Sequence, residues 1–460
     1  MCGIIGVSGR ADAAALAKLG LFALQHRGQE SAGMVSVDNG AAHVVRRMGL
    51  VSDAFTAQDL ADLKGAVAVG HTRYSTAGTS TLDNAQPVFV RFKGGHISLA
   101  HNGNLTNANV VRAQLESDGS IFGSSMDSEV IVHRLAKAPP GKPEEMLAHA
   151  LSGLEGSYSL IVTIGDTLLA ARDPRGWRPL AMGKLGDAIV FASETCAFDI
   201  IGATTVRDVA PGEIIAVDNG TVRSLMASAP LPLTRCVFEF VYFARPDSTI
   251  FGGSVDHARR NLGRALAREA PAPNADLVFA VPDSSNASAL GYAEESGIRL
   301  ENALIRNHYI GRTFIQPSQA DRKNNVRMKF NPVREVIAGK SVVMVDDSIV
   351  RGNTTRALVA LVRSAGAREV HMRVASAPIT GPCYYGIDIP TKRELIAATQ
   401  TVPEIAKTLG VDSLAYLSLD GMLSAAPGGP GGFCHACFSG KYPIAPPRGA
   451  DEDRDGRDRE

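Results

Sequence analysis

The sequence VVMVDDSIVRGNTT at positions 342–355 is the feature that most constrains how this chain can fold. Its first four, apolar residues predict a buried strand that ends on two adjacent carboxylates, Asp346 and Asp347. A loop of small residues from Ser348 to Thr355 follows, and the next residues favour a helix. N–H groups of such a loop and of a helix N-terminus bind phosphate, and the carboxylates can accept from ribose hydroxyls or approach a hydrated Mg²⁺. The alternative interpretation is a capped helix with both aspartates as ordinary turn formers.

The second half of the chain alternates apolar strands with helices. DLVFAVPDSS predicts a further buried strand that runs into a loop, and ASALGYAEESG predicts the helix after it. Such alternation indicates a parallel sheet. The first half has many short strand-like segments and few helices, such as one expected at 13–24, and predicts layered sheets with helices packed outside. The Pro-rich ASAPLPLTRC marks the boundary between the halves.

Length and charge narrow the class of protein. A chain of 460 residues is too long for one ordinary core and indicates two or three domains. Lys plus Arg and Asp plus Glu both number 47, so no overall charge favours nucleic acid or an anionic membrane. The sequence has no run of about 18 apolar residues and no secretory leader. We therefore expect a cytoplasmic protein with no membrane or nucleic-acid partner.

The string at 342–355 resembles the diphosphate-sugar signature of the type I phosphoribosyltransferases. FAVPDSS resembles the loop that contacts pyrophosphate in that family, and the basic segment from Arg312 to Lys329 resembles its flexible hood. The resemblance implies a magnesium site at Ser284, Asp346 and Asp347. The residues it implies for phosphoribosyl pyrophosphate are Asp283, Ser284, Asp346, Asp347, Ser348, Arg351, Gly352, Asn353, Thr354 and Thr355. The hood's candidates to neutralise pyrophosphate, with a solvated basic loop as the alternative, are Arg322, Lys323, Arg327 and Lys329.

A cysteine at position 2 raises a separate chemical question. Loss of Met1 would leave Cys2 with a thiol and a free α-amino group on neighbouring carbons. An α-amino group titrates at about pH 8, so at neutral pH a sizeable fraction is neutral and can take the thiol proton as a built-in base. The alternative is that Cys2 packs as a small hydrophobe.

Five short motifs bear on that question together. CGIIGV, HRGQESAG, GHTRYSTAG, AHNGNLTN and MDSEV follow one another along the chain. Together they resemble the glutamine amidotransferases of the N-terminal nucleophile class across nearly the whole first half. Arg27, in the second motif, is expected to support the site rather than contact the substrate.

This resemblance implies the roles of five residues. Cys2 is the implied nucleophile on the side-chain carbonyl of glutamine, giving a γ-glutamyl thioester. The Asn102 side chain and the Gly103 N–H are the implied oxyanion hole. Arg73 would bind the α-carboxylate of glutamine and Asp127 its α-ammonium group.

Six cysteines are too few for a disulfide scaffold in a chain of this size. Cys434 and Cys437 form a C-x-x-C motif, which alone is a weak signal. With Cys236 and Cys383 they match the four thiolate positions at which one branch of the resembled family holds a [4Fe–4S] cluster. Structural zinc and free thiols are the alternatives. Cys196 matches no motif and is expected to be a buried small residue.

Over nearly all of its length the chain resembles the amidophosphoribosyltransferases. The resemblance implies a four-layer αββα N-terminal-nucleophile hydrolase domain at 2–230, a parallel-sheet type I phosphoribosyltransferase domain at 231–445 that carries the cysteine site, and a disordered tail at 446–460. It also implies that glutamine-derived ammonia displaces pyrophosphate from phosphoribosyl pyrophosphate with Mg²⁺ bound, that purine nucleotides inhibit, and that the chain forms a homotetramer.

Two other classes share part of this pattern. A sugar-phosphate amidotransferase or an asparagine synthetase could share the first half, but each would need a different second half from the one that carries VVMVDDSIVRGNTT. A non-catalytic purine regulator could retain a phosphoribosyl pyrophosphate pocket. That regulator would have no need of Cys2, Arg73, Asn102 and Asp127.

Overall fold

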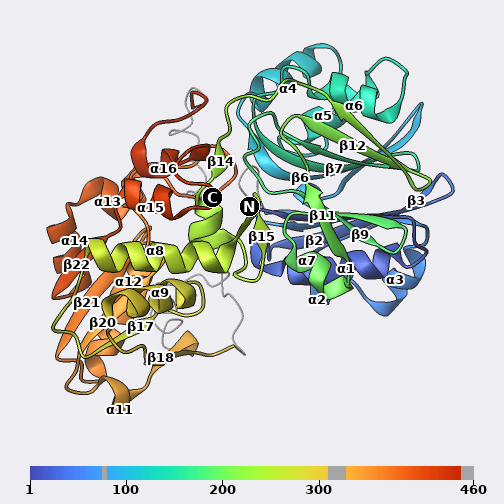
Figure 1. The fold of residues 1–460 in the computed structure, drawn as a ribbon. Helices are drawn as coiled ribbons and strands as arrows, with labels where there is room; N and C mark the ends of the chain where they lie inside the picture. Colours follow the sequence, from blue (N-terminus) through green and yellow to red (C-terminus); the bar gives the residue numbers. More distant parts are fainter. Residues whose placement is uncertain (75–79, 309–327, 447–460) are drawn as a thin grey trace.

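The computed structural model describes residues 1–74, 80–308 and 328–446. Figure 1 shows the first half, in blue to green, beside the second, in yellow-green to red, with the N-terminus where the two meet. Within the described ranges, every helix is too short or too polar to span a lipid bilayer.

The first half contains two antiparallel sheets that pack face to face. The seven-stranded sheet has the order β11-β9-β10-β1-β4-β2-β3. Its strands are β1 (Gly3–Ser8), β2 (Ser31–Asp38), β3 (Ala41–Met48), β4 (Val67–Arg73), β9 (Ala181–Leu185), β10 (Ala188–Ala192) and β11 (Thr204–Asp208). The six-stranded sheet has the order β13-β12-β8-β7-β6-β5. Its strands are β5 (Val88–Phe92), β6 (Gly95–Leu105), β7 (Gly156–Ile164), β8 (Thr167–Arg172), β12 (Glu213–Asp218) and β13 (Thr221–Met226).

Helices cover the outer face of each sheet, as Figure 1 shows. On the seven-stranded sheet lie α1 (Ala13–Ala23), α2 (Val51–Ala54), α3 (Ala57–Asp62) and α7 (Cys196–Ile201). On the six-stranded sheet lie α4 (Ala108–Ser117), α5 (Glu129–Ala136) and α6 (Pro143–Leu151). The short 3-10 turns are η1 (Gln25–Arg27) and η2 (Leu82–Asn84). The four-layer αββα prediction is therefore confirmed, with the first helix one residue shorter than expected.

Strand β1 illustrates why the apolar pattern of the first half is continuous rather than alternating. Ile4 belongs to the core between the two sheets, whereas Ile5 belongs to the core under α1. Because both faces of the strand are covered, every residue from Gly3 to Ser8 is buried. This burial on both sides places the residue before the strand, Cys2, deep in the molecule.

The second half is built on a four-stranded parallel sheet of order β17-β20-β21-β22. These strands are β17 (Leu277–Ala280), β20 (Ser341–Asp346), β21 (Glu369–Val374) and β22 (Ser413–Tyr416). On β20, Val343 and Val345 pack toward α8 (Val255–Glu269) and α9 (Asn286–Ser296), while Val342 and Met344 pack toward α12 (Asn353–Ser364) and α14 (Val402–Leu409). The predicted parallel α/β sheet is thus confirmed.

Short elements complete the second half and connect it to the first. The small sheets pair β14 (Arg235–Cys236) with β23 (Phe433–Cys434), β15 (Thr249–Ile250) with β16 (Gly253–Ser254), and β18 (Leu304–Arg306) with β19 (Phe330–Pro332). The short helices are η3 (Glu239–Phe243), α11 (Arg334–Ile337), η4 (Lys392–Glu394), α13 (Ile396–Thr399), α15 (Leu419–Ala425) and α16 (Ala436–Ser439). Met1 and Trp177 of the first half belong to the core cluster of the second, so the two halves share buried surface.

Candidate functional site

A small pocket in the first half brings together four of the five residues that the sequence predicted for glutamine. It is lined by Cys2, Arg73, Tyr74, Gln86, His101, Gly103, Met126 and Asp127. Cys2 precedes β1 and Arg73 ends β4, which are neighbours in the seven-stranded sheet, while Gly103 lies on β6 of the opposing sheet. The pocket therefore forms where the ends of both sheets meet.

Asn102, the fifth of these residues, is buried beside the pocket and contacts Cys2 directly. The backbone nitrogen of Cys2 donates to Oδ1 of Asn102 over 3.2 Å, and the Cys2 thiol lies 3.6 Å from the carbonyl oxygen of Tyr74. The Asn102 side chain is fully buried, and within the described residues its Nδ2 has no hydrogen-bond partner. A buried amide donor left unpaired is costly unless a ligand satisfies it. Next to a thiol nucleophile, that donor suits a developing oxyanion.

Gly103 follows Asn102 where the backbone leaves no room for a side chain. A methyl group on its Cα would overlap the carbonyl of Ser157 on the neighbouring strand β7. Only glycine permits this approach without moving the paired strands. The HNGN motif thus places the amide side chain of Asn102 and the bare backbone of Gly103 close to Cys2.

Arg73 and Asp127 supply opposite charges to the pocket. Arg73 is almost fully buried, and its Nη1 lies 3.7 Å from Oε2 of Glu30. Oδ2 of Asp127 accepts the Leu105 N–H over 2.8 Å, and Oδ1 lies 3.7 Å from Nδ1 of His101. A cation and an anion in one pocket suit an amino acid, whose α-groups carry the complementary charges.

His101 was not identified from the sequence, although it directly precedes Asn102 in AHNGN. Burial alone would raise the pKa of Asp127, but His101 and the Leu105 N–H hold it below its ordinary value. Burial likewise opposes the charge on His101, but Asp127 raises the pKa of that imidazole. His101 therefore helps to keep Asp127 ionised.

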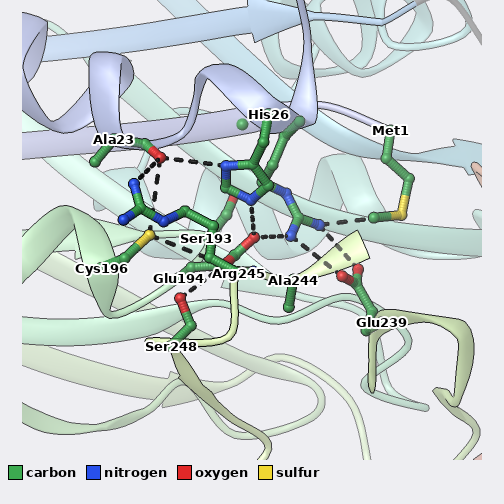
Figure 2. A network of polar contacts seen from close by, with 12 residues as sticks. Met1, Ala23, His26, Ser193, Glu194, Cys196, Glu239, Ala244, Arg245 and Ser248 are labelled. Carbon is green, nitrogen blue, oxygen red and sulfur yellow. Dashed lines mark hydrogen bonds and ion pairs between the residues drawn. The ribbon is translucent and has the colours of Figure 1, made fainter. Parts of the chain in front are cut away.

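A buried polar network lies behind the nucleophile, and Figure 2 shows it around Glu194. Arg27 donates from Nε to the carbonyl oxygen of Cys2 over 3.0 Å, and its Nη1 and Nη2 donate to Glu239 over 3.1 and 2.9 Å. Nη1 of Arg27 also donates to Glu194. Glu239 belongs to η3 in the second half, so Arg27 connects the Cys2 backbone to that half. Its supporting role stays a prediction.

Met1, which precedes Cys2, is buried. Its Sδ lies 2.7 Å from Nη1 of Arg178. Burial lowers the pKa of the Met1 α-amino group to about 6. The nitrogen of Cys2 is an amide while Met1 is present, so it is a hydrogen-bond donor and not a base.

Cys196 is buried, as expected, with its sulfur 3.9 Å from the carbonyl oxygen of Ala23 and from Oε2 of Glu194. Burial and the nearby Glu194 carboxylate together raise the pKa of its thiol to about 12. A thiol held in this way is not a nucleophile at neutral pH.

The acidic pair of the second half ends β20, as the sequence predicted. Both carboxylates are buried; Oδ1 of Asp346 accepts from Ser285 over 3.1 Å, and Oδ1 of Asp347 accepts from Ser348 over 2.6 Å. Burial and the adjacent Asp347 raise the pKa of Asp346 well above its ordinary value. Burial also raises the pKa of Asp347, although Ser284, Ser348 and the nearby Arg259 oppose that effect.

The loop after this pair leads into α12, as predicted for a phosphate-binding turn. Gly352 has φ of +76°, and a side chain there would meet Ile396 at 2.8 Å. Residues 353–355 form the first turn of α12. Arg351 is half exposed and pairs with Glu394 at 2.6 Å.

The pyrophosphate loop and the basic segment are described in part. Asp283 follows β17 and pairs with Arg306 at 2.6 Å. Of the hood candidates, Arg322, Lys323 and Arg327 lie outside the described residues, as does most of the segment that begins at Arg312. Lys329 is described, and its carbonyl accepts the Asn307 N–H over 2.7 Å.

The four predicted cysteine ligands are all buried beside the junction of the halves. Cys236 and Cys434 are register partners on β14 and β23, Cys437 lies on α16, and Cys383 lies in the loop after β21. Burial raises the pKa of Cys437 well above its ordinary value, and the other three thiols raise it further. In the described ranges, no three His, Cys, Asp or Glu side chains form a group that could hold a metal ion.

Two packed sheets enclose a cysteine, a charged pocket and an amide donor with no partner among the described residues, an arrangement that suits a glutamine amidotransferase. The parallel sheet that ends in an acidic pair suits a phosphoribosyltransferase. A family model described as a glutamine amidotransferase domain matches residues 71–199. The chloroplastic amidophosphoribosyltransferase of Vigna aconitifolia is 48% identical over 446 residues, which are 97% of this chain and 92% of that protein. The amidophosphoribosyltransferase of Archaeoglobus fulgidus is 47% identical over 453 residues, 97% of this chain and 99% of that one.

A solved structure gives the same result. Glutamine phosphoribosylpyrophosphate amidotransferase from B. subtilis, complexed with ADP and GMP, has a TM-score of 0.91 and 45% identity over 96% of this chain and 98% of that one. The chain belongs to the amidophosphoribosyltransferase family. It is a pentosyltransferase of purine biosynthesis with a glutamine amidotransferase domain.

Proposed function

We propose that Cys2 hydrolyses glutamine and that the ammonia released displaces pyrophosphate from C1 of phosphoribosyl pyrophosphate at the Asp346–Asp347 site, giving 5-phosphoribosylamine. The observation that carries this assignment is the unpaired Nδ2 of Asn102 beside Cys2 among the described residues. We place the boundary between the two catalytic domains at 230/231, with the tail beginning at residue 446.

In the first half, removal of Met1 converts the nitrogen of Cys2 into an amine that takes the thiol proton. The thiolate forms a bond to the side-chain carbonyl carbon of glutamine, and the carbonyl electrons move to oxygen. Asn102 Nδ2 and the Gly103 N–H stabilise that oxyanion. Collapse of the intermediate expels ammonia, which carries the transferred proton, and water then hydrolyses the thioester to glutamate. Arg73 and Asp127 hold the α-groups of the substrate throughout.

In the second half, the loop Ser348–Thr355 and the first turn of α12 hold the 5′-phosphate through backbone N–H groups. Two buried, adjacent carboxylates and the Ser284 hydroxyl form an oxygen donor set that fits Mg²⁺. This ion typically binds one or two carboxylates together with substrate phosphates. It would neutralise charge on the departing pyrophosphate, while Asp346 and Asp347 orient the ribose.

We propose that Cys236, Cys383, Cys434 and Cys437 hold a [4Fe–4S] cluster. Burial and the neighbouring cysteines raise the pKa of Cys236, Cys434 and Cys437, so thiolates there are unstable without a cation. In such a cluster each cysteine binds a different iron, so the ligands need not converge on one ion as they do at zinc. The fully buried guanidinium of Arg178 adds positive charge beside Cys236 and Cys383. Anaerobically purified protein should contain about four irons per chain, and a colourless, zinc-loaded sample would reject the cluster.

Partners and location belong to the same proposal. The neighbouring B. subtilis structure contains ADP and GMP, which supports purine nucleotides as inhibitors of this chain. We propose a homotetramer, measurable by light scattering. Six cysteines that form no disulfide in the described residues suit the reducing cytoplasm, where we place the protein.

We propose that the first half hydrolyses glutamine and the second half transfers the phosphoribosyl group. The test of this assignment is Cys2→Ala, assayed with glutamine and with ammonium salt as nitrogen sources. We expect glutamine-dependent synthesis to be lost and ammonia-dependent synthesis to be retained, because the second half carries the transfer. Cys196→Ala is the matched control, since that buried cysteine lies outside the pocket. Loss of both activities in Cys2→Ala, with Cys196→Ala intact, would reject the assignment.

A further inference from the structure

A segment of the second half, Tyr384–Gly386, lies directly against the strand that carries Asn102 and Gly103. The Asn104 side-chain amide donates to the carbonyl of Tyr384 over 2.9 Å, across 280 positions of sequence. Ser157, on the neighbouring strand β7, donates its hydroxyl to the carbonyl of Tyr385 over 2.7 Å. The same hydroxyl accepts the Asn104 N–H over 3.2 Å, so it bridges the two halves at this point.

Gly386 makes the closest approach of this segment. Its φ is +98°, and a methyl carbon on its Cα would stand 2.9 Å from the carbonyl carbon and 3.0 Å from the carbonyl oxygen of Gly103. The Gly103 backbone cannot move away from a side chain at position 386, because it already packs against the Ser157 carbonyl. The backbone of residue 103 is therefore confined between β7 of its own half and Gly386 of the other.

The segment is itself held firmly. The Tyr385 carbonyl also accepts from Nε of Arg178 over 3.1 Å, and Arg178 is fully buried. The Tyr385 ring stacks on Trp177 with 4.6 Å between ring centroids. These contacts use buried groups of the first half, so the position of the segment depends on how the halves dock.

We propose that Tyr384–Gly386 is a positioning element for glutamine hydrolysis. It fixes the backbone of residues 102–104, so that the two oxyanion donors stay oriented toward the developing oxyanion. The proposal rests on the assignment of Asn102 and Gly103 as the oxyanion hole. Preorganised donors stabilise the tetrahedral intermediate because they need no reorganisation as charge develops, and a small displacement removes that benefit. The bound substrate is held elsewhere, by Arg73 and Asp127, so displacement of the donors affects turnover more than binding.

The central experiment compares Gly386→Ala with Gly428→Ala. Gly428 has φ of +85° and nothing within 4 Å of the added carbon, so it reproduces the backbone strain without the contact. We expect Gly386→Ala to lower kcat for glutamine hydrolysis by about 10–100-fold, with KM for glutamine changed by less than about threefold and ammonia-dependent synthesis unchanged. Equal glutaminase kcat in both variants would overturn the proposal, as would a rise in KM with kcat unchanged.

Ser157→Ala provides a second route that introduces no strain, since it removes the hydroxyl that joins Tyr385 to Asn104. We expect a smaller fall of kcat, about 3–10-fold, with the same unchanged KM and ammonia-dependent activity. If Gly386→Ala does not fold, this variant decides the question, and a wild-type kcat overturns the proposal. Asn102→Ala, measured in parallel, distinguishes failure of the oxyanion-hole assignment from failure of the positioning role. Retained turnover in Asn102→Ala would reject the oxyanion hole itself, whereas its loss with wild-type turnover in both positioning variants would reject only the role of Tyr384–Gly386.

Discussion

The backbone nitrogen of Cys2 lies 3.2 Å from Oδ1 of Asn102, whose Nδ2 is buried and has no partner among the described residues. One side chain thus orients the terminus of the nucleophile with its oxygen and offers its amide to the substrate. Removal of Met1 would convert this nitrogen from an amide donor into an amine that can act as a base.

Glutaminase activity should therefore follow the fraction of chains that lack Met1. A base works when unprotonated, so kcat/KM for glutamine should be maintained above the pKa of the Cys2 amine, ordinarily about 8 for an α-amino group, and fall as pH drops through it. Intact-mass spectrometry beside initial rates measures both quantities. Full glutaminase activity in protein that retains Met1 would contradict the mechanism.

His101→Gln should make glutamine binding sensitive to mild acid. His101 lowers the pKa of Asp127, and an Asp with a lowered pKa stays ionised until the pH falls further. Removing the imidazole raises that pKa, so the ratio of variant to wild-type KM should increase as the pH falls from about 7 to 5. His96→Gln, at the other end of β6, is the control and should keep a constant ratio. A constant ratio in His101→Gln would exclude this role.

The sequence was sufficient for the parts that depend on local pattern. The strand and loop at 342–355 carry their own signals of apolar run, carboxylates and small residues, and the structure places β20 and α12 there. Cys2, Arg73 and Asp127 of the N-terminal motifs line one pocket, because Cys2 precedes β1, Arg73 ends β4 and Asp127 lies just before α5. Their roles toward glutamine stay predictions.

Contacts between the halves were beyond sequence reasoning. Arg27 meets Glu239 from 212 positions away, and neither residue has a local pattern that marks the other. The same holds for Gly386, which looks like an ordinary turn glycine until the docking of the halves sets it against Gly103. His101 is different, because its place in AHNGN would have identified it.

Asp346→Asn should stabilise the unliganded protein while abolishing synthesis from both nitrogen sources. A carboxyl group whose pKa is raised on folding contributes stability that is full below the unfolded pKa, about 4, and is lost as pH rises through the folded value. At pH 7.5 the variant should be more stable than the wild type, and the gain should vanish near pH 4. The amide oxygen can still accept from Ser285.

Thermal denaturation with and without Mg²⁺ and phosphoribosyl pyrophosphate checks this prediction. The wild type should gain stability from the ligands and Asp346→Asn should not. Asp187→Asn, in the exposed turn between β9 and β10, is the control and should behave as the wild type. If unliganded Asp346→Asn melted at a lower temperature than the wild type, the repulsion between the buried Asp346 and Asp347 carboxylates would not be what destabilises the unliganded protein.

Glu239→Gln should weaken both the fold and the glutaminase. Arg27, Arg178, Glu194 and Glu239 are fully buried, and their charges balance, so loss of one carboxylate leaves a buried guanidinium without full compensation, at a cost of about 3 kcal/mol. Because Arg27 also donates to the Cys2 carbonyl, glutamine-dependent synthesis should fall more than ammonia-dependent synthesis. Asp247→Asn breaks the exposed Arg245–Asp247 pair and should cost less than about 1 kcal/mol. Urea denaturation of both variants measures the difference, and equal losses would mean that the buried network adds no more stability than a surface ion pair.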